Sequence, residues 1–150
     1  MITKKVNRYY CEFCKKANCS ASSISNHEKS CTLNPNRVCR VCKMDRGEWE
    51  KGEWKQPKIS KLLAVLPDPV LFKTTNDQGD STYHSGLTLA VNVALPELRK
   101  LTSNCPACIM SALRQKGIPV PMATDFDFSS EMKSIWAEIN FTNDINENPW

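Results

Sequence analysis

The chain has 150 residues, with 20 Lys and Arg against 16 Asp and Glu, and its formal net charge is +4 at pH 7. This length allows one ordinary domain or two small units held together by metal. The longest apolar run, Leu62–Leu66, is far too short to cross a membrane, so a membrane-spanning class is excluded.

The charge is unevenly placed along the chain. Residues 1–46 carry a net charge of +7, whereas residues 47–150 carry −3. A basic N-terminal third suits an anionic partner such as DNA or RNA. The same charge also fits a solvated protein surface, and the composition alone leaves both alternatives open.

Eight cysteines are too many for a chain of this size without a structural role. Disulfides would require an oxidising compartment, but no apolar stretch follows Met1–Lys5, so we expect no signal peptide. Metal thiolates in a reducing environment, either the cytoplasm or nucleus or a virus particle, are the better interpretation.

The first group of metal-ligating residues has the spacing C-x-x-C, a gap of twelve, then H-x-x-x-C. A C-x-x-C pair brings two thiolates within reach of one metal ion, and residues four apart on a helix share a face. The pattern predicts one closed tetrahedral zinc site with the ligands Cys11, Cys14, His27 and Cys31.

Residues 9–31 resemble a two-Cys-two-His zinc finger in which Cys31 replaces the last His. Ile24 stands three residues before His27, where that family keeps its core Leu, but the family's core aromatic would fall on Asn18. The resemblance implies a knuckle strand over residues 9–15 and a helix over residues 20–31.

In this family the helix positions that contact DNA bases would correspond to Ser20, Ser23 and Asn26. None of these is a cation able to bind guanine through two hydrogen bonds, although Asn26 could face adenine. We therefore expect any nucleic-acid binding to be largely sequence-tolerant. The candidate contacts are Lys4, Lys5, Arg8, Lys15, Lys16 and Asn26.

A second zinc site follows from the remaining pairs, because each C-x-x-C needs a partner pair. We assign Cys39, Cys42, Cys105 and Cys108 to this site, which leaves Cys19 without a metal. Between Trp49 and Trp54, Lys51-Gly52 predicts a hairpin turn. A knuckle, a hairpin and a helix carrying the second pair resemble a treble-clef zinc module.

We interpret residues 56–104, between the two cysteine pairs, as an insertion with its own helices and strands. We predict a helix over Pro57–Leu66, a strand over Val70–Thr74 and a polar loop over Asn76–Ser81. Apolar residues alternate over Leu87–Leu95, which favours a half-buried strand although a helix remains possible, and Pro96 should open a short helix.

The C-terminal part should begin with a helix over Ala107–Lys116 that is capped by Gly117. Gly117–Pro121 reads as an extended linker, and a last amphipathic helix should cover residues 130–140 before a polar tail. We therefore expect a small, zinc-stabilised α+β protein. Its parts would be a finger at 1–32, a four-cysteine module at 33–118, and a linker, helix and tail at 119–150.

The one enzymatic alternative that we consider is an H-N-H-type nuclease, since His84 lies between the two cysteine pairs with Asp77 and Asp80 nearby. Such a site needs a second metal-holding residue next to the catalytic His, and the sequence has none there. Both inferred zinc sites are also filled by protein ligands. We expect no enzyme activity and no small-molecule substrate.

Two functions remain. In the first, the protein is a zinc-binding adaptor or scaffold subunit of a larger assembly, such as a virus particle or a nucleoprotein complex, and its partners are other protein subunits. In the second, it binds DNA or RNA through its basic N-terminal third. We favour the first, because a single finger with weak base-contacting positions buries too little surface to bind well alone.

Overall fold

The computed structural model describes residues 5–45 and 56–147. It shows a small α+β protein, as predicted, with two two-stranded sheets among the described residues. The elements in chain order are β1 (Tyr9–Tyr10), β2 (Ala17–Asn18), α1 (Ala21–Ser30), α2 (Arg40–Asp45), α3 (Ile59–Val65), the 3₁₀ helix η1 (Pro69–Phe72), β3 (Lys73–Thr75), β4 (Ser81–Tyr83), α4 (Ser85–Thr102), α5 (Pro106–Lys116), the 3₁₀ helix η2 (Val120–Met122) and α6 (Phe128–Glu147).

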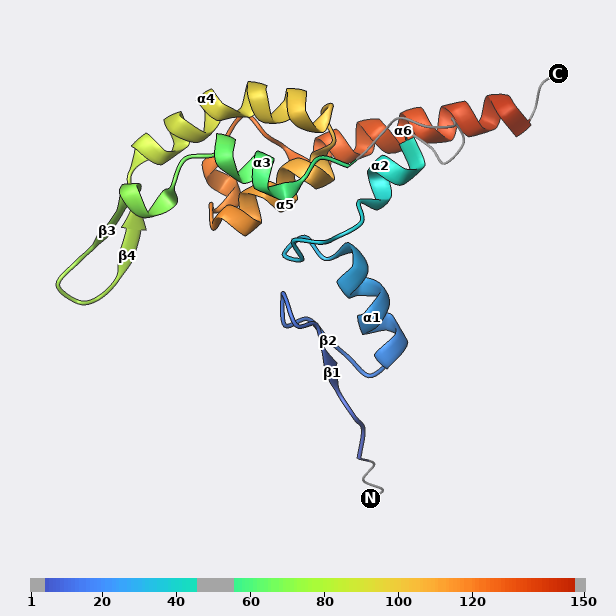
Figure 1. Cartoon of the computed structure of the whole chain (residues 1–150), viewed down its shortest axis with the longest axis horizontal. Helices are drawn as coiled ribbons and strands as arrows, with labels where there is room; N and C mark the ends of the chain where they lie inside the picture. Colours follow the sequence, from blue (N-terminus) through green and yellow to red (C-terminus); the bar gives the residue numbers. More distant parts are fainter. Residues whose placement is uncertain (1–4, 46–55, 148–150) are drawn as a thin grey trace.

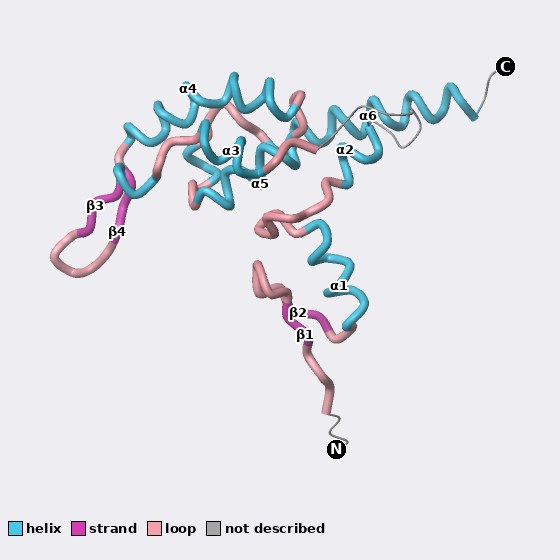
Figure 2. Tube along the Cα trace, in the orientation of Figure 1, coloured by secondary structure: helices cyan, strands magenta, loops and turns pink. Residues whose placement is uncertain are grey.

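The chain is arranged as a small ββα unit and a larger helical body. Figure 1 shows β1, β2 and α1 to one side of the body formed by α3, α4 and α5, with α2 leading from one part to the other. Strands occur only at the two hairpins of the described chain (Figure 2). The proposed Trp49–Trp54 hairpin, Lys4 and Trp150 lie outside the described residues.

The ββα unit forms where the finger was predicted. Strands β1 and β2 are antiparallel, with Tyr9 opposite Asn18 and Tyr10 opposite Ala17. Helix α1 begins after Ser20, whose side-chain oxygen accepts a hydrogen bond from the backbone N–H of Ser23 at the first turn. The unit has too few apolar residues to fold around a core of its own, so its metal ligands must supply the missing stability.

The helical body has one apolar core to which every helix from α3 to α5 contributes. Helix α4 packs against α3 and α5, and α5 also contacts α6. The fully or nearly buried core residues are Leu62, Leu66, Leu87, Val91, Leu95, Leu98, Ile109, Ala112, Leu113, Ile118, Ala123 and Phe126. This core is built by helices, and of the hairpin β3–β4 Tyr83 packs against it.

The strand predicted over Leu87–Leu95 is wrong, because these residues belong to the 18-residue helix α4. Leu87, Val91 and Leu95 recur every four residues and are fully or almost fully buried, as one helix face requires. Leu89 and Val93 lie on the opposite face, 69% and 73% exposed, and their spacing produced the apparent period of two. Helix α4 also runs through Pro96, which therefore opens no new helix.

Other boundaries also differ from the predictions, among them that of the helix predicted over Pro57–Leu66, because α3 spans only Ile59–Val65. Val70–Thr74 begins in η1, where the Asp68 carboxylate accepts a hydrogen bond from the Val70 N–H, and only residues 73–75 form a strand. Gly117–Pro121 is not an extended linker, because Ile118 is buried in the core and η2 follows. The last helix is longer than predicted, since α6 spans Phe128–Glu147.

The helix predicted over Ala107–Lys116 is α5, which begins one residue earlier, at Pro106, and ends as predicted. Gly117 adopts a left-handed φ of 79°, and its N–H donates to the carbonyl of Arg114. No helix among residues 5–45 and 56–147 has the length and apolarity that crossing a bilayer requires.

Helix α6 is fixed to the body by an ion pair with α4. Both guanidinium nitrogens of Arg99 donate to the Glu131 carboxylate at 2.9 and 2.7 Å, and one also donates to the carbonyl of Asp125 at 3.1 Å. The Arg99 guanidinium also lies 5.9 Å from the centre of the Phe126 ring. These contacts hold the start of α6 against the C-terminal half of α4.

We predict that Glu131→Gln lowers the free energy of unfolding by about 1 kcal/mol, because a two-point, partly buried ion pair is lost. The control is Glu97→Gln, which removes a 4.0 Å pair with Lys100 that is largely exposed and should cost less than about 0.5 kcal/mol. Urea unfolding of the zinc-loaded protein measures both. Equal effects of the two substitutions would contradict the assigned role of the Arg99 pair.

Candidate metal centres

The four ligands predicted for the first site are brought together by the ββα unit. Cys11 and Cys14 lie in the knuckle after β1, His27 is on α1, and Cys31 is the residue at which α1 ends. All their ligand atoms lie within 4.8 Å of one another. The Sγ of Cys14 is 3.1 Å from Nε2 of His27. The arrangement is a cluster of three thiols and one imidazole that closes around one point.

Backbone hydrogen bonds shape the knuckle. The Cys11 N–H donates to the Lys16 carbonyl at 2.9 Å, and the Lys15 N–H donates to the Cys11 carbonyl at 3.0 Å. Lys15 adopts a left-handed φ of 61°, which turns the chain after Cys14. The Glu28 carboxylate on α1 accepts from the Glu12 N–H at 2.8 Å, and this bond ties the knuckle to the helix.

The second site joins residues that are far apart in the sequence, as predicted. Sγ of Cys39 lies 3.6 Å from Sγ of Cys105, and Cys42 and Cys108 are separated by the same distance. A tetrahedron with zinc–sulfur bonds of about 2.3 Å has edges of roughly 3.8 Å, so the observed spacing fits a zinc ion. All four residues are at most 3% exposed.

The elements on either side explain how this cluster forms. Cys105 is the residue before α5 and Cys108 lies in its first turn, while Cys39 precedes α2 and Cys42 lies within it. The positive end of the α5 dipole therefore faces thiolates. Met132 and Ile135 of α6 pack over the cluster and help to exclude water.

The pKa values of the clustered thiols are shifted in opposite directions. Burial raises the pKa of the Cys31 thiol. Hydrogen bonding with Cys105 lowers the pKa of Cys39 but raises the pKa of Cys42 and of Cys108, so the four thiols cannot all ionise by themselves. A divalent cation removes this conflict, because thiolates are its ligands.

The donor sets identify the metal. Sulfur with one imidazole, or sulfur alone, in a tetrahedral arrangement is the chemistry of zinc. Each cluster already has four protein ligands, which is the closed geometry of structural zinc sites. The chain therefore has two structural zinc sites.

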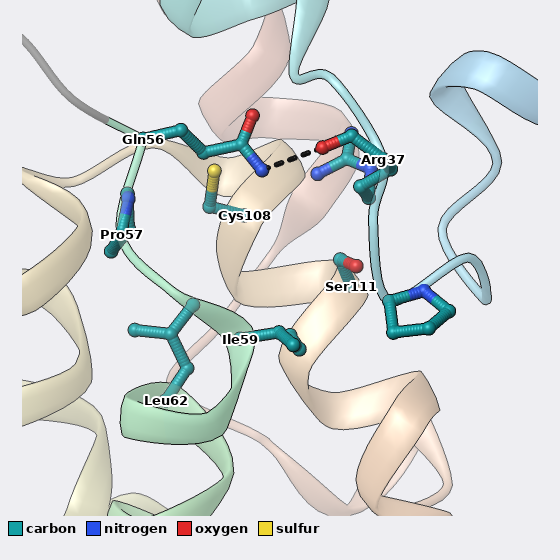
Figure 3. Close-up of a pocket in the computed structure, with 8 residues that line it drawn as sticks. Arg37, Gln56, Pro57, Ile59, Leu62, Cys108 and Ser111 are labelled. Atoms are coloured by element: carbon teal, nitrogen blue, oxygen red, sulfur yellow. Dashed lines mark hydrogen bonds between the residues drawn. The ribbon is translucent and has the colours of Figure 1, made fainter.

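Gln56 forms hydrogen bonds with the backbone beside Cys39, a role that no sequence pattern predicted. Its side-chain NH2 donates to the Arg37 carbonyl at 2.8 Å, and its side-chain oxygen accepts from the Cys39 N–H at 2.7 Å. Figure 3 shows Gln56 reaching toward Arg37 beside Cys108, at one end of a pocket that Ile59 also lines. A lone Gln after a polar segment carries no sequence signal for this contact.

The ββα unit is attached to α5 by hydrogen bonds to the turn that follows α1. Ser111 donates to the Thr32 carbonyl at 2.7 Å, and the Gln115 amide donates to the carbonyls of Thr32 and Asn34 at 2.9 and 3.1 Å. Arg37, which is 8% exposed, donates to the Ala107 carbonyl at 3.3 Å. The two zinc sites are thus parts of one connected structure.

The other candidate residues do not lie together in a site. His84 precedes α4 and is exposed, and Asp77 and Asp80 lie in the exposed β3–β4 loop. Among the described residues, the two cysteine clusters are the only groups placed to hold a metal. Cys19 is exposed, as are Lys5, Arg8, Lys15, Lys16 and Asn26.

Comparison of the chain with protein-family models, with curated proteins and with solved structures finds no match. The class of the protein is therefore inferred from the geometry of its two clusters of metal ligands. It is a zinc-binding protein with one site of three cysteines and a histidine and one site of four cysteines.

We predict two zinc ions per chain by elemental analysis of the natively purified protein, because each cluster supplies a full ligand set. Cys19→Ser should leave this number unchanged, since Cys19 belongs to neither cluster. A zinc content of one or none, or disulfides in the native protein, would contradict the assignment.

The two zinc sites should stabilise different parts of the chain. Zinc binding to such a site contributes on the order of 10 kcal/mol, similar to the whole stability of a small domain. We expect Cys14→Ser to unfold residues 9–31 only, and Cys108→Ser to unfold most of residues 38–117. Hydrogen exchange resolved by peptide measures both against Cys19→Ser. Parent-like protection of α4 and α5 in Cys108→Ser would contradict this division.

Proposed function

We propose that the protein is a non-enzymatic adaptor or scaffold subunit of a larger assembly, such as a virus particle or a nucleoprotein complex, in which zinc is purely structural. Both metal sites have their full set of protein ligands, which supports a structural role. The described residues also show no further cluster of the kind that metal-dependent hydrolysis needs.

The observation that carries this proposal is the apolar surface of the helical body. Val70 and Leu71 in η1 are 70% and 78% exposed, and Leu89 and Val93, one turn apart on α4, are 69% and 73% exposed. Single exposed apolar residues are common, but exposed pairs on neighbouring elements favour a contact surface. Helix η1 packs directly against α4.

Helix α6 supports the same interpretation. In Figure 1 its C-terminal part continues beyond the helical body. Trp136 and Phe141 on this helix are 40% and 67% exposed. Aromatic side chains are the residues that most often anchor protein interfaces, and a projecting helix offers them to a neighbouring subunit.

The second candidate function is nucleic-acid binding by the N-terminal third. Lys5, Arg8 and Lys16 are exposed, and no ion pair with a carboxylate is found for them among residues 5–45 and 56–147. The Ser20 hydroxyl is engaged in capping α1, so the first base-contacting position of the finger is not available. This supports binding through phosphates with little dependence on sequence.

To test the adaptor proposal, we expect Leu89→Ser/Val93→Ser to lose the protein partners that co-purify stoichiometrically with the parent chain from its native source. These side chains are solvent-exposed, so zinc content and melting temperature should stay close to those of the parent. Glu97→Ser/Lys100→Ser, on exposed positions of the same helix, should keep the partners.

The adaptor proposal would be contradicted if the Leu89→Ser/Val93→Ser variant kept every partner. It would also be contradicted if the purified chain bound random duplex DNA with sub-micromolar affinity at physiological salt. Non-specific binding through a few phosphates is weaker than about 1 μM under those conditions, so tighter binding would make nucleic acid the main partner.

A further inference from the structure

The hairpin of the ββα unit carries three aromatic side chains, and each of them is more than a third exposed. Tyr9, Tyr10 and Phe13 are 39%, 56% and 37% exposed. The core of the unit consists instead of the buried Cys11, Ile24 and Cys31, with Cys14 and Leu33 packed against them. Burying an aromatic ring would stabilise so small a unit, so their exposure points to a role at the surface.

The strand register separates the two tyrosines. Cys11 is buried against α1, and side chains alternate between the faces of a strand, so Tyr10 points away from α1. Its cross-strand neighbour is Ala17, whose methyl group leaves the ring face uncovered. Arg8, two residues before Tyr10, is exposed and directly precedes β1.

Positive charge surrounds these rings. Lys5, Arg8, Lys15 and Lys16 are exposed and lie within the hairpin or directly before it. Of the two carboxylates in the unit, Glu28 is engaged by the Glu12 N–H. Lys15 donates to a backbone carbonyl, that of Glu12, at 2.9 Å. The exposed surface of the hairpin therefore combines aromatic rings with cations, together with one carboxylate, that of Glu12.

We propose that this face binds single-stranded nucleic acid, with bases stacked on Tyr10 and Phe13 and phosphates bound by Arg8, Lys5 and Lys16. The inference rests on the second candidate function and specifies its ligand. Stacking needs bases that are free of a duplex, and aromatic rings interleaved with cations are the recognition chemistry of single strands. The charge of the face complements a polyanion.

The test measures binding of the full-length, zinc-loaded chain to labelled oligo(U) and oligo(dT) of about 12 nucleotides and to a duplex of similar length. Fluorescence anisotropy at about 50 mM salt gives the affinities, since one small module binds in the micromolar range. We expect both single strands, or one of them, to bind more tightly than the duplex. Preference for one of the two strands tells whether RNA or DNA is the ligand.

Tyr10→Ala should weaken single-strand binding about tenfold, whereas Tyr10→Phe should keep it, because the ring and not the hydroxyl stacks. The matched control is Phe141→Ala, which removes a similarly exposed aromatic from α6 and should leave affinity unchanged. Arg8→Gln/Lys16→Gln should lower the slope of log affinity against log salt by roughly 1.4, about 0.7 for each lost phosphate contact. Zinc content confirms that each variant is folded.

Equal or tighter binding to the duplex, or a Tyr10→Ala variant no weaker than Phe141→Ala, overturns the stacking site while leaving phosphate-mediated binding as a candidate function. Absence of binding to all three probes at low salt overturns both. Single-strand preference that is lost in Tyr10→Ala and kept in Tyr10→Phe supports the proposal.

Discussion

The rest of the structure depends on the four-cysteine cluster, because it joins two parts of the chain 66 residues apart. Cys39 and Cys42 meet Cys105 and Cys108 at 3.6 Å, a distance at which thiolates repel one another unless a cation lies between them. Closing so long a loop costs conformational entropy, and metal–thiolate bonds offset that cost. Zinc binding and the folding of the helical body are therefore coupled.

Helix α5 is the element that this cluster positions, and three parts of the molecule meet on it. Its N-terminal end holds Cys105 and Cys108, while Ile109 and Leu113 enter the apolar core with α3 and α4. On another side of α5, the Ser111 hydroxyl donates a hydrogen bond to the Thr32 carbonyl, in the turn after α1. Loss of the metal at this helix would therefore disturb both the core and the attachment of the ββα unit.

The two parts of the molecule present different surfaces, so weak nucleic-acid binding at one surface is compatible with protein binding at the other. The helical body exposes aliphatic side chains such as Leu89 and Val93, and these suit another protein subunit. The ββα unit exposes Tyr10 among cations such as Arg8, and these suit a nucleic acid. A subunit of a nucleoprotein assembly could use one surface for each contact.

The sequence by itself determined both sets of metal ligands, because the local spacing of C-x-x-C and H-x-x-x-C marks the ligand pairs, and each C-x-x-C pair needs a partner pair to close a tetrahedral site. It also determined the end of α5, since only Gly117 easily adopts the left-handed conformation found there. Other features were decided only by the tertiary structure. Leu89 and Val93 became exposed residues of a helix, because the buried stripe of α4 faces its neighbours every four residues. Burial of Ile118 and the bonds of Gln56 arise from contacts between distant segments, and no local pattern encodes such contacts.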